Sequence, residues 1–374
     1  MYIHNRLENK SNFFQKIKQI DYILLFCILI LGAVSMVTMY STDGGQILFY
    51  TKSHFIKFII FSFLMLVIAF FNIRLWFSLS YLFYFILVLM LIWTINFGIT
   101  VSGSQRWMNL YFINIQPSEL MKIAIILCLA KYFHRMRLEN VNSFYSVITS
   151  LIIIFVPMSL VVIQPDLGTS ILISISGIIV LWFVGLNHKY FFYSCLISIV
   201  SLPFIISFLK PYQKLRILTF LNPDRDPLGA GYQIIQSKIA VGSGGLIGKG
   251  FLKGTQSYLE FLPEKHTDFI FTLFSEEFGF FGSVLLLAIY AIIIYRIIFI
   301  GSISRSYFAK IFCYSFGSAI FVFITINMFM VLGMLPIVGS PLPIMSYGGS
   351  SMLATMIGFG IVLSAKIHSQ QSIA

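Results

Sequence analysis

The sequence predicts an all-α polytopic membrane protein with about ten transmembrane helices and one long outer loop between the seventh and eighth spans. Of its 374 residues, 58% are hydrophobic and only 10% are charged, and the mean hydropathy is +0.92. A soluble chain has roughly a quarter charged residues, and a disordered chain is poor in aromatic residues. This chain has 40 Phe and 19 Tyr, so both of those classes are excluded.

Ten hydrophobic runs are long enough to cross the ~30 Å hydrocarbon core as helices of about 20 residues. They are Asp21–Tyr40, Phe55–Phe71, Phe77–Thr94, Pro117–Phe133, Val147–Ile163, Ser170–Gly185, Phe191–Leu209, Phe269–Arg296, Ile311–Leu335 and Ser350–Ala365. The pattern predicts a single membrane domain over residues 21–365, with an outer loop at 210–268. Residues 1–20 form an N-terminal segment and residues 366–374 a tail.

Basic residues predict the orientation of the bundle. An even number of spans places both termini on the same side. The loops and terminal segments of that side carry thirteen basic residues, and the short loops opposite carry only Lys52, Lys57 and Arg106. The positive-inside rule therefore predicts two cytoplasmic termini.

The distribution of basic residues argues against nucleic-acid binding, and the cysteine spacing argues against a metal site or a disulfide framework. The net charge is +12, but its basic residues are scattered between apolar runs, which does not fit a nucleic-acid surface. Cys27, Cys128, Cys195 and Cys313 each fall in a separate apolar run, without metal-site or disulfide spacing. They are predicted to fill the core.

Polar residues cluster at the predicted outer ends of the third and fourth spans. Arg106 follows the third span, and Pro117 suits the first position of the fourth helix. Glu119 then lies in the first turn, where a carboxylate complements the helix dipole, and Lys122 lies on the same face. The spacing predicts an intrahelical ion pair. That pair either caps the helix or holds a buried cation against an anionic ligand.

Asp166 lies in a short connection between the fifth and sixth spans, within the stretch Gln164–Thr169. Its carboxylate either caps the sixth helix or stands at the rim of an outward cavity. In the cavity it would hold a basic partner or a divalent ion.

The long outer loop contains turn-rich and glycine-rich segments. The apolar positions of Ile234–Val241 predict a short interfacial or re-entrant helix, and six glycines follow between residues 242 and 254. Gly248-Lys249-Gly250 does not match a phosphate-binding loop, so nucleotide binding is excluded. The glycines form either a flexible loop or a close approach of backbone to a lipid head group.

Asp268 stands where this loop enters the eighth span. The stretch from Asp268 to Arg296 would make a helix of roughly 43 Å, longer than the bilayer core. A break is therefore predicted near Glu276, Glu277 and Gly279, which would leave Asp268 on a short outward half-helix or as a helix cap. Glu264 and His266 lie beside Asp268, but no fourth metal ligand is evident.

A Pro- and Gly-broken segment, Gly339–Ser351, leads into the tenth span. It either lines a polar cavity or simply connects two helices.

Together these segments resemble the SEDS family (shape, elongation, division and sporulation), membrane glycosyltransferases that polymerise peptidoglycan from lipid II. The most specific stretches are Gln116–Lys122, Gln164–Thr169, Pro223–Gly250, Leu262–Phe271 and Pro341–Ser351. Pro227–Lys238 and Glu260–Asp268 resemble the rod-shape branch more than the division branch.

The resemblance implies a ten-helix enzyme of the bacterial cytoplasmic membrane that acts in cell elongation. Its expected partners are lipid II, the nascent glycan strand, membrane lipid and a class B penicillin-binding protein, which is a transpeptidase. The sequence does not define the contact surface for this partner, and lipid-facing positions of the eighth and ninth spans are candidates for it. Asp268 matches the essential carboxylate, and Glu119 with Lys122 matches a buried ion pair. The candidate substrate contacts are Arg106, Glu119, Lys122, Asp166, Lys238, Lys265, His266 and Ser346.

The chemistry of this reaction assigns roles to these residues. Asp268 is the candidate general base for the attacking sugar hydroxyl. The departing diphosphate is already a stable anion, so it needs positive charge and no acid. Arg106, Lys122, Lys238 and Lys265 are candidates for that charge, with or without Mg²⁺ or Mn²⁺, whose ligands are unassigned. A single displacement would invert the anomeric centre.

Two other functions fit the same features. Ten spans with a buried ion pair and a glycine-rich loop also suit a transporter or a flippase for a lipid-linked precursor. The two halves of the chain, however, show no matching pair of interrupted helices. The third alternative is a non-catalytic scaffold for a transpeptidase.

Overall fold

The computed structural model describes residues 13–101, 104–109, 114–208, 211–226, 229–255 and 264–373, most of which are helical. Ten of the helices described have 18 residues or more. They are α2 (Tyr22–Thr42), α3 (Phe49–Phe70), α4 (Ile73–Phe97), α5 (Pro117–His134), α6 (Phe144–Ile163), α7 (Leu167–Val184), α8 (His188–Phe208), α12 (Ile270–Ile303), α13 (Tyr307–Val331) and α14 (Gly349–Ile367). Eight are long and apolar enough to cross a membrane, and the other two are α5 and α8. Each coincides with one predicted span, so the expected helical membrane fold is confirmed.

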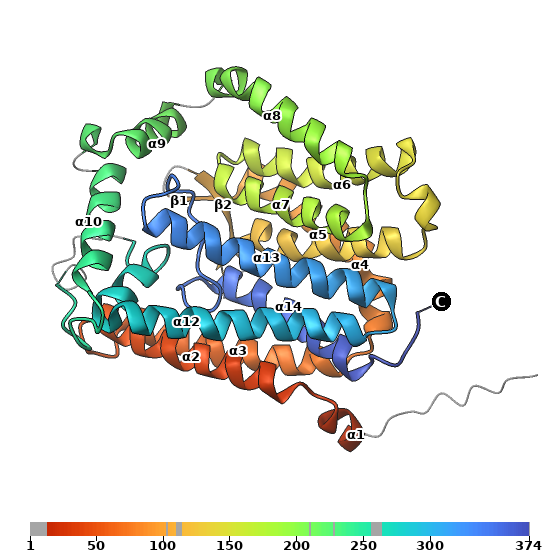
Figure 1. Ribbon diagram of the computed structural model, residues 1–374, viewed down its shortest axis with the longest axis horizontal. Helices are drawn as coiled ribbons and strands as arrows, with labels where there is room; N and C mark the ends of the chain where they lie inside the picture. The colour runs from red at the N-terminus through yellow and green to blue at the C-terminus, as the bar shows by residue number, and fades with distance from the viewer. Residues whose placement is uncertain are drawn as a thin grey trace, which may run out of the picture.

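The long helices lie side by side along the longest axis of the molecule (Figure 1). α5 and α14 are the most enclosed helices, and α14 packs against α3, α5, α12 and α13. α13 also packs against α5 and α7, whereas α8 runs obliquely outside α6 and α7. The core is thus built around α5, α13 and α14.

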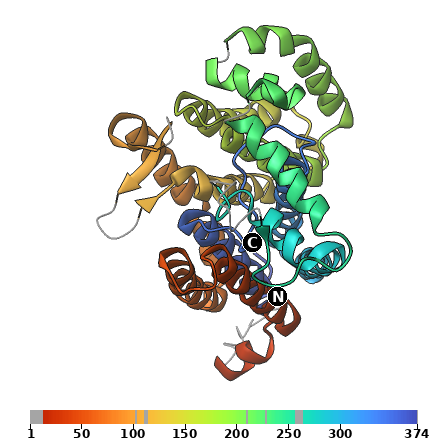
Figure 2. The same ribbon diagram turned by 90° about the vertical axis from the view of Figure 1, so that its left-hand side faces the viewer.

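The two ends of the bundle differ. The short helix α1 (Phe13–Lys18) and the C-terminus lie at one end, here called the tail end (Figure 1, right). Residues 368–373 lie at this end, where the Arg305 N–H donates to the Ser369 carbonyl (2.8 Å) and Arg74 Nη2 to the Ser372 carbonyl (3.3 Å). The opposite end, seen face-on in Figure 2, contains the start of α12, which Asp268 closely precedes, and is called the site end.

Three short strands at the site end were not expected from the sequence. β1 (Ile99–Val101), β2 (Ser104–Asn109) and β3 (Asn114–Ile115) form an antiparallel sheet in the order β1-β2-β3. Backbone groups outside a helix still need hydrogen-bond partners, and these strands supply them to one another. The sheet places Arg106 in the middle strand.

The long loop contains two short helices, and short helices were expected there. α9 (Pro211–Leu221) precedes a short 3₁₀ turn, η2 (Pro223–Arg225), and α10 (Ala230–Ser243) includes the predicted helix Ile234–Val241 and extends it. α10 packs against α12 and α9. Residues 256–263 of this loop lie outside the described part of the chain.

α12 contains the predicted break. Gly279 has φ 66° and ψ −161°, which are not helical. The Gly-rich loop bonds to the backbone groups freed there: Lys249 N–H donates to the Glu276 carbonyl (3.0 Å), and Phe280 N–H to the Gly245 carbonyl (2.9 Å). Lys249 Nζ also pairs with the buried Glu276 carboxylate (2.6 Å). The loop therefore satisfies backbone hydrogen-bonding groups that the break leaves open, and these bonds hold the loop against α12.

Three details of the sequence-based prediction are corrected. Asp268 lies in a turn before α12 and is neither in the half-helix nor its cap, which is Phe269. α3 begins at Phe49 rather than Phe55, because the polar residues of its first turns face protein: Thr51 Oγ1 donates to Asp43 (2.6 Å). Cys195 is exposed on α8, unlike the other three cysteines.

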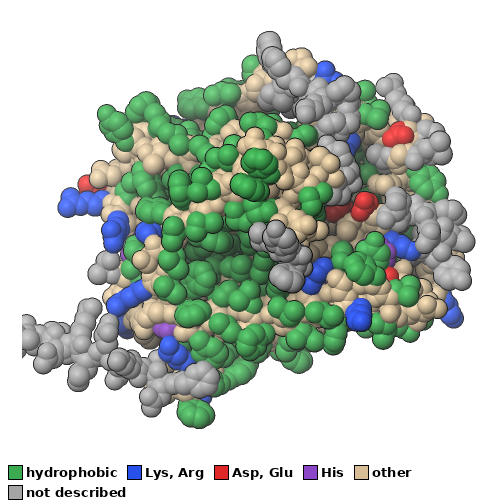
Figure 3. All heavy atoms as spheres, turned by 180° about the vertical axis from the view of Figure 1, so that it is seen from behind, with side chains coloured by type: hydrophobic (Ala, Val, Ile, Leu, Met, Phe, Trp, Pro, Cys, Tyr) green, Lys and Arg blue, Asp and Glu red, His purple; other side chains and the backbone are tan. Residues whose placement is uncertain are grey.

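On the face shown in Figure 3, apolar side chains are spread over the middle, and the charged side chains that are visible lie toward the two ends. This distribution suits a bundle whose flanks face lipid.

Candidate active site

The turn that carries Asp268 is fastened to two other elements. Asn327 of α13 is fully buried, and its Nδ2 donates to the carbonyls of Asp268 (3.0 Å) and Ser340 (2.7 Å). Ser346 Oγ donates to the Thr267 carbonyl (2.6 Å), and the Tyr347 N–H donates to the His266 carbonyl (2.8 Å). The Pro- and Gly-rich segment before α14 thus holds the turn in place.

The Asp268 carboxyl has an unusual acidity. Burial is the largest of the influences that together raise the pKa of Asp268 to about 7, and the neighbouring charge of Glu264 acts in the same direction. Arg106 and Arg216 lower the pKa of Asp268, and Glu119 raises it slightly. This partly buried acid therefore exchanges its proton near neutral pH, as a general base must.

Arg106 and Asp166 form an ion pair close to Asp268. Arg106 Nη1 lies 3.0 Å from Asp166 Oδ2, which also accepts hydrogen bonds from Thr169 Oγ1 (2.8 Å) and Gln116 Nε2 (3.3 Å). Asp166 is the N-cap of α7, with Oδ1 accepting from the Thr169 N–H (3.1 Å). The Asp166 carboxylate therefore both caps α7 and binds a basic side chain. The sequence had offered these two roles as alternatives, and the structure combines them.

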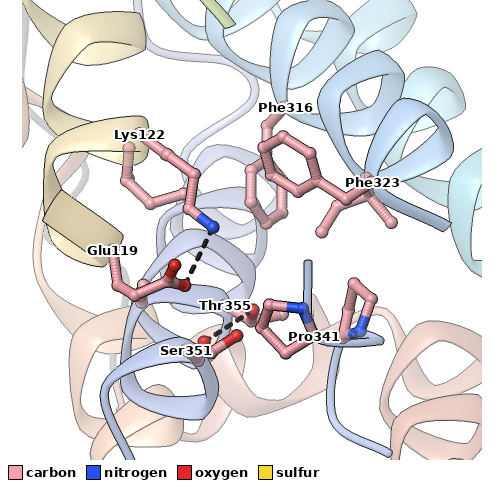
Figure 4. A pocket seen from close by; sticks show the side chains of 11 residues that line it. Glu119, Lys122, Phe316, Phe323, Pro341, Ser351 and Thr355 are labelled. Carbon is pink, nitrogen blue, oxygen red and sulfur yellow. Dashed lines mark hydrogen bonds and ion pairs between the residues drawn. The ribbon is translucent and has the colours of Figure 1, made fainter. Parts of the chain in front are cut away.

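Glu119 and Lys122 form the expected intrahelical ion pair at the start of α5. Lys122 Nζ lies 2.8 Å from Glu119 Oε2, and both side chains are almost fully buried. They line a pocket with Phe316 and Phe323 of α13, Pro341 and Pro343, and residues of α14, and Lys122 points toward the Phe323 ring (Figure 4). The pair faces a cavity and not lipid.

A cluster on α3 was not singled out by the sequence. The ring of Tyr50 stacks on that of His266 (3.9 Å between centroids) and meets that of Tyr347 edge-on (5.1 Å). Lys57 Nζ donates to the Tyr347 hydroxyl (3.0 Å), and His266 Nδ1 lies 3.0 Å from Thr42 Oγ1. Only the tertiary structure brings α3 to the turn that carries Asp268.

Three further candidates occupy different positions. The Lys238 side chain is exposed on α10 and ends against Gly333, where no described contact joins it to Asp268. Lys265 is half-buried within the Asp268 turn. The Ser346 hydroxyl is buried and also accepts from the Leu342 N–H (2.7 Å), so its bonds are made within the protein, which favours positioning of the turn over contact with substrate.

Two residues missed by the sequence stand close to Asp268. Arg216 of α9 donates from Nη1 to the Ile337 carbonyl (3.2 Å), two residues before Gly339, which lies against the Asp268 carboxylate. Asn327 lies in the middle of an apolar run, where a lone amide is costly to bury without a hydrogen-bond partner. Its position in the sequence could therefore have indicated a role in the site.

No group of three or more His, Cys, Asp or Glu side chains suited to a metal ion occurs in the described part of the chain. The oxygens of Asp166 are taken by Arg106, Thr169 and Gln116. Among the described residues, the side chains near Asp268 therefore include cations but no metal-ligand set.

Comparisons with known proteins agree with this arrangement. Peptidoglycan glycosyltransferase MrdB of Escherichia coli K12 is 44% identical over 290 residues, covering 76% of this chain and 77% of that protein. Probable peptidoglycan glycosyltransferase FtsW of Buchnera aphidicola subsp. Baizongia pistaciae is 34% identical over 357 residues, covering 93% of each.

Solved structures share the fold. A chain from a study of the structural coordination of polymerization and crosslinking by a peptidoglycan synthase complex superimposes with a TM-score of 0.81 at 28% identity, covering 94% of this chain and 99% of that one. The rod shape determining protein RodA of Thermus thermophilus gives 0.70 at 23% identity, covering 94% and 98%. The model of the cell cycle protein family FtsW, RodA and SpoVE matches residues 15–371. The chain therefore belongs to the FtsW, RodA and SpoVE family, which is the SEDS family.

Proposed function

We infer that the protein is a peptidoglycan glycosyltransferase of cell elongation that polymerises lipid II, and we propose that Asp268 is its general base. The observation that carries the proposal is an acid with a pKa of about 7 whose turn is held by Asn327 of α13 and by the segment before α14, and whose acidity the Arg106 charge influences. The relatives' names support the reaction class, and the geometry supports the assignment of roles.

In the proposed reaction, the Asp268 carboxylate accepts the proton of the acceptor's 4-hydroxyl as that oxygen bonds to C1 of the donor sugar. The bond from C1 to the donor diphosphate breaks with inversion, and the diphosphate leaves as an anion. Asp268 then returns its proton to water. The base needs no partner acid, because the leaving group is already stable.

Positive charge near Asp268 stabilises the departing diphosphate in this proposal. Arg106 is held by Asp166, and Lys122 by Glu119, so both cations are positioned before substrate arrives. A divalent cation is compatible with a diphosphate, but the described side chains do not form a ligand set for one. Charge compensation is therefore assigned to the side chains.

The proposed setting is the outer face of the bacterial cytoplasmic membrane, with the site end outward. The solved structural relative belongs to a complex for polymerization and crosslinking. We propose that this chain likewise works with a class B penicillin-binding protein that crosslinks the new strands.

The test is polymerisation of lipid II by purified protein, alone and with its transpeptidase partner. Asp268→Asn keeps the size of the side chain and removes the base, so we expect glycan strands to fall below about one hundredth of the wild-type amount. Asp224→Asn, at an exposed acid of the same loop, is the matched control and should retain activity.

Three outcomes would contradict the proposal. Wild-type strand lengths from Asp268→Asn would remove Asp268 from the role of base. Translocation of lipid II in vesicles without polymer would identify a flippase. If neither occurs with the partner present, the protein is a scaffold.

A further inference from the structure

Lys57 is a cation inside a membrane-spanning helix at the site end. It lies on the third turn of α3 and is half-buried. Its Nζ donates to the Tyr347 hydroxyl (3.0 Å) and lies 4.3 Å from the centroid of the Tyr347 ring. Charged side chains in such helices are costly, so a partner for the charge is expected.

Three other cations of this end have acidic partners. Arg106 faces Asp166, Lys122 faces Glu119, and Lys249 faces Glu276. Among the residues that the structure describes, no carboxylate lies within ion-pair distance of Lys57. An ammonium group has three N–H donors, and the phenol of Tyr347 takes one of them.

The surroundings of Lys57 add positive potential. Its side chain runs against Gly349, the first residue of α14: a Cβ placed there would lie 3.5 Å from Lys57 Cε and 3.8 Å from Nζ. The N-terminus of a helix carries a partial positive charge, and a cation beside it is disfavoured unless an anion is also present. The Lys57 ammonium and the helix terminus would therefore attract the same anion.

Contacts relate this position to the catalytic turn. Tyr347 holds Lys57 through its hydroxyl and His266 through its backbone N–H (2.8 Å), and Asp268 follows two residues later. Lys57 thus lies beside the turn, one aromatic side chain removed from it. Arg106 and Arg216 approach Asp268 from β2 and α9, which are different elements.

The chemistry of polymerisation needs two diphosphates at one site, because donor and acceptor are both lipid-linked. The donor diphosphate is attached to the carbon under attack and must lie next to the base. The acceptor diphosphate is at the far end of a disaccharide from the attacking hydroxyl. Its anion therefore binds away from Asp268, where a separate cation is required.

We propose that Lys57, with the N-terminus of α14, binds the diphosphate of the acceptor substrate, while the cations beside Asp268 serve the donor. The inference rests on the proposed function and adds a second anion subsite to it. Ile56, the preceding residue, is 45% exposed on the flank of α3, so a lipid-linked ligand can reach this position from the bilayer.

A purely structural role is the alternative, in which Lys57 only holds Tyr347 in place. The two roles differ in kinetics. Loss of an acceptor contact raises the lipid II concentration needed for half-maximal rate, whereas misplacement of the catalytic turn lowers the maximal rate. Tyr347→Phe removes the hydroxyl and keeps the lysine, so it isolates the structural contact.

The experiment measures initial polymerisation rates against lipid II concentration for wild type, Lys57→Met, Lys57→Arg and Lys52→Met. Lys52 is exposed on the same helix and is the matched control. We expect Lys57→Met to raise the half-saturating concentration about tenfold, with the maximal rate changed less than threefold. Lys57→Arg, Tyr347→Phe and Lys52→Met should stay near wild type in half-saturation.

A second measurement identifies the source of the bound phosphate. Thermal stabilisation of purified protein by undecaprenyl diphosphate is compared with that by phosphatidylglycerol. Weaker stabilisation of Lys57→Met by undecaprenyl diphosphate alone supports the acceptor subsite. A loss confined to phosphatidylglycerol would indicate a structural lipid and overturn it.

The remaining outcomes are also decisive. An unchanged half-saturating concentration in Lys57→Met, or a lower maximal rate shared by Tyr347→Phe, overturns the subsite while wild-type polymerisation stands. Absence of polymer from the wild type, with its partner present, would count against the proposed function itself.

Discussion

At the scale of single residues, the acidity of Asp268 follows from its surroundings. A carboxyl at a protein surface ionises near pH 4, and this one is shifted by loss of water and by Glu264. Arg106 and Arg216 oppose the shift only in part. The balance leaves a base strong enough to accept a proton and still largely ionised slightly above neutral pH.

This acidity predicts the pH dependence of the reaction. The base works when ionised, so the polymerisation rate should rise through a pH of about 7 and level off above it. Below that pH we expect a fall of about tenfold per unit. The measurement is the initial rate from pH 5.5 to 8.5 at saturating lipid II.

Glu264→Gln tests whether the pH dependence of the rate comes from Asp268. Removal of the neighbouring negative charge lowers the pKa of Asp268, so the rise should move to lower pH. A profile that is flat in the wild type, or shifts upward in Glu264→Gln, would be inconsistent with Asp268 as the base.

At the scale of elements, the break in α12 depends on one glycine. Gly279 has a positive φ, which side chains with a Cβ rarely adopt, and a Cβ there would lie 2.3 Å from the Gly248 nitrogen. The loop that carries Gly248 approaches this closely because it bonds to the open backbone of the helix. A helix interruption and a glycine-rich loop therefore form one unit.

Gly279→Ala should destabilise this unit by about 2 kcal/mol or more, through strain at φ and the clash with Gly248. Thermal unfolding of the detergent-solubilised protein measures the effect. Gly242→Ala is the control: Gly242 lies within α10, and a Cβ there meets nothing within 4 Å. Equal stability of the two variants would show that the break tolerates a side chain.

At the scale of the whole molecule, the two ends of the bundle differ in the contacts that they contain. The tail end is tied together by the C-terminal residues, with His134 Nε2 lying 3.2 Å from the Ile373 carbonyl. An ion pair between Asp21 and Arg296 joins α2 to α12. The site end instead collects the loops, the sheet and the cations around Asp268.

Orientation in the membrane is predicted from the basic residues. Cys195→Ser removes the exposed native cysteine and serves as the background. In this background, Glu264→Cys should react with a membrane-impermeant maleimide added to intact spheroplasts. Ser372→Cys should react only after permeabilisation. The reverse pattern would place the site end in the cytoplasm and exclude polymerisation at the outer face.

The sequence by itself determined the number and approximate position of the spans, the ion pair of Glu119 with Lys122, and the break near Gly279. Each depends on local properties: hydrophobic length, helical spacing and a helix too long for the bilayer. Pro117 at the start of α5 and the cap at Asp166 are equally local.

Only the tertiary structure decided which distant segments surround Asp268. Asn327, Arg216 and Lys57 come from three helices that are far apart in the chain. The β-hairpin that positions Arg106 also escaped the sequence, because its few polar residues carry no periodic signal. Local patterns describe what each segment can form, whereas packing selects the faces that meet, and the candidate site lies where those faces meet.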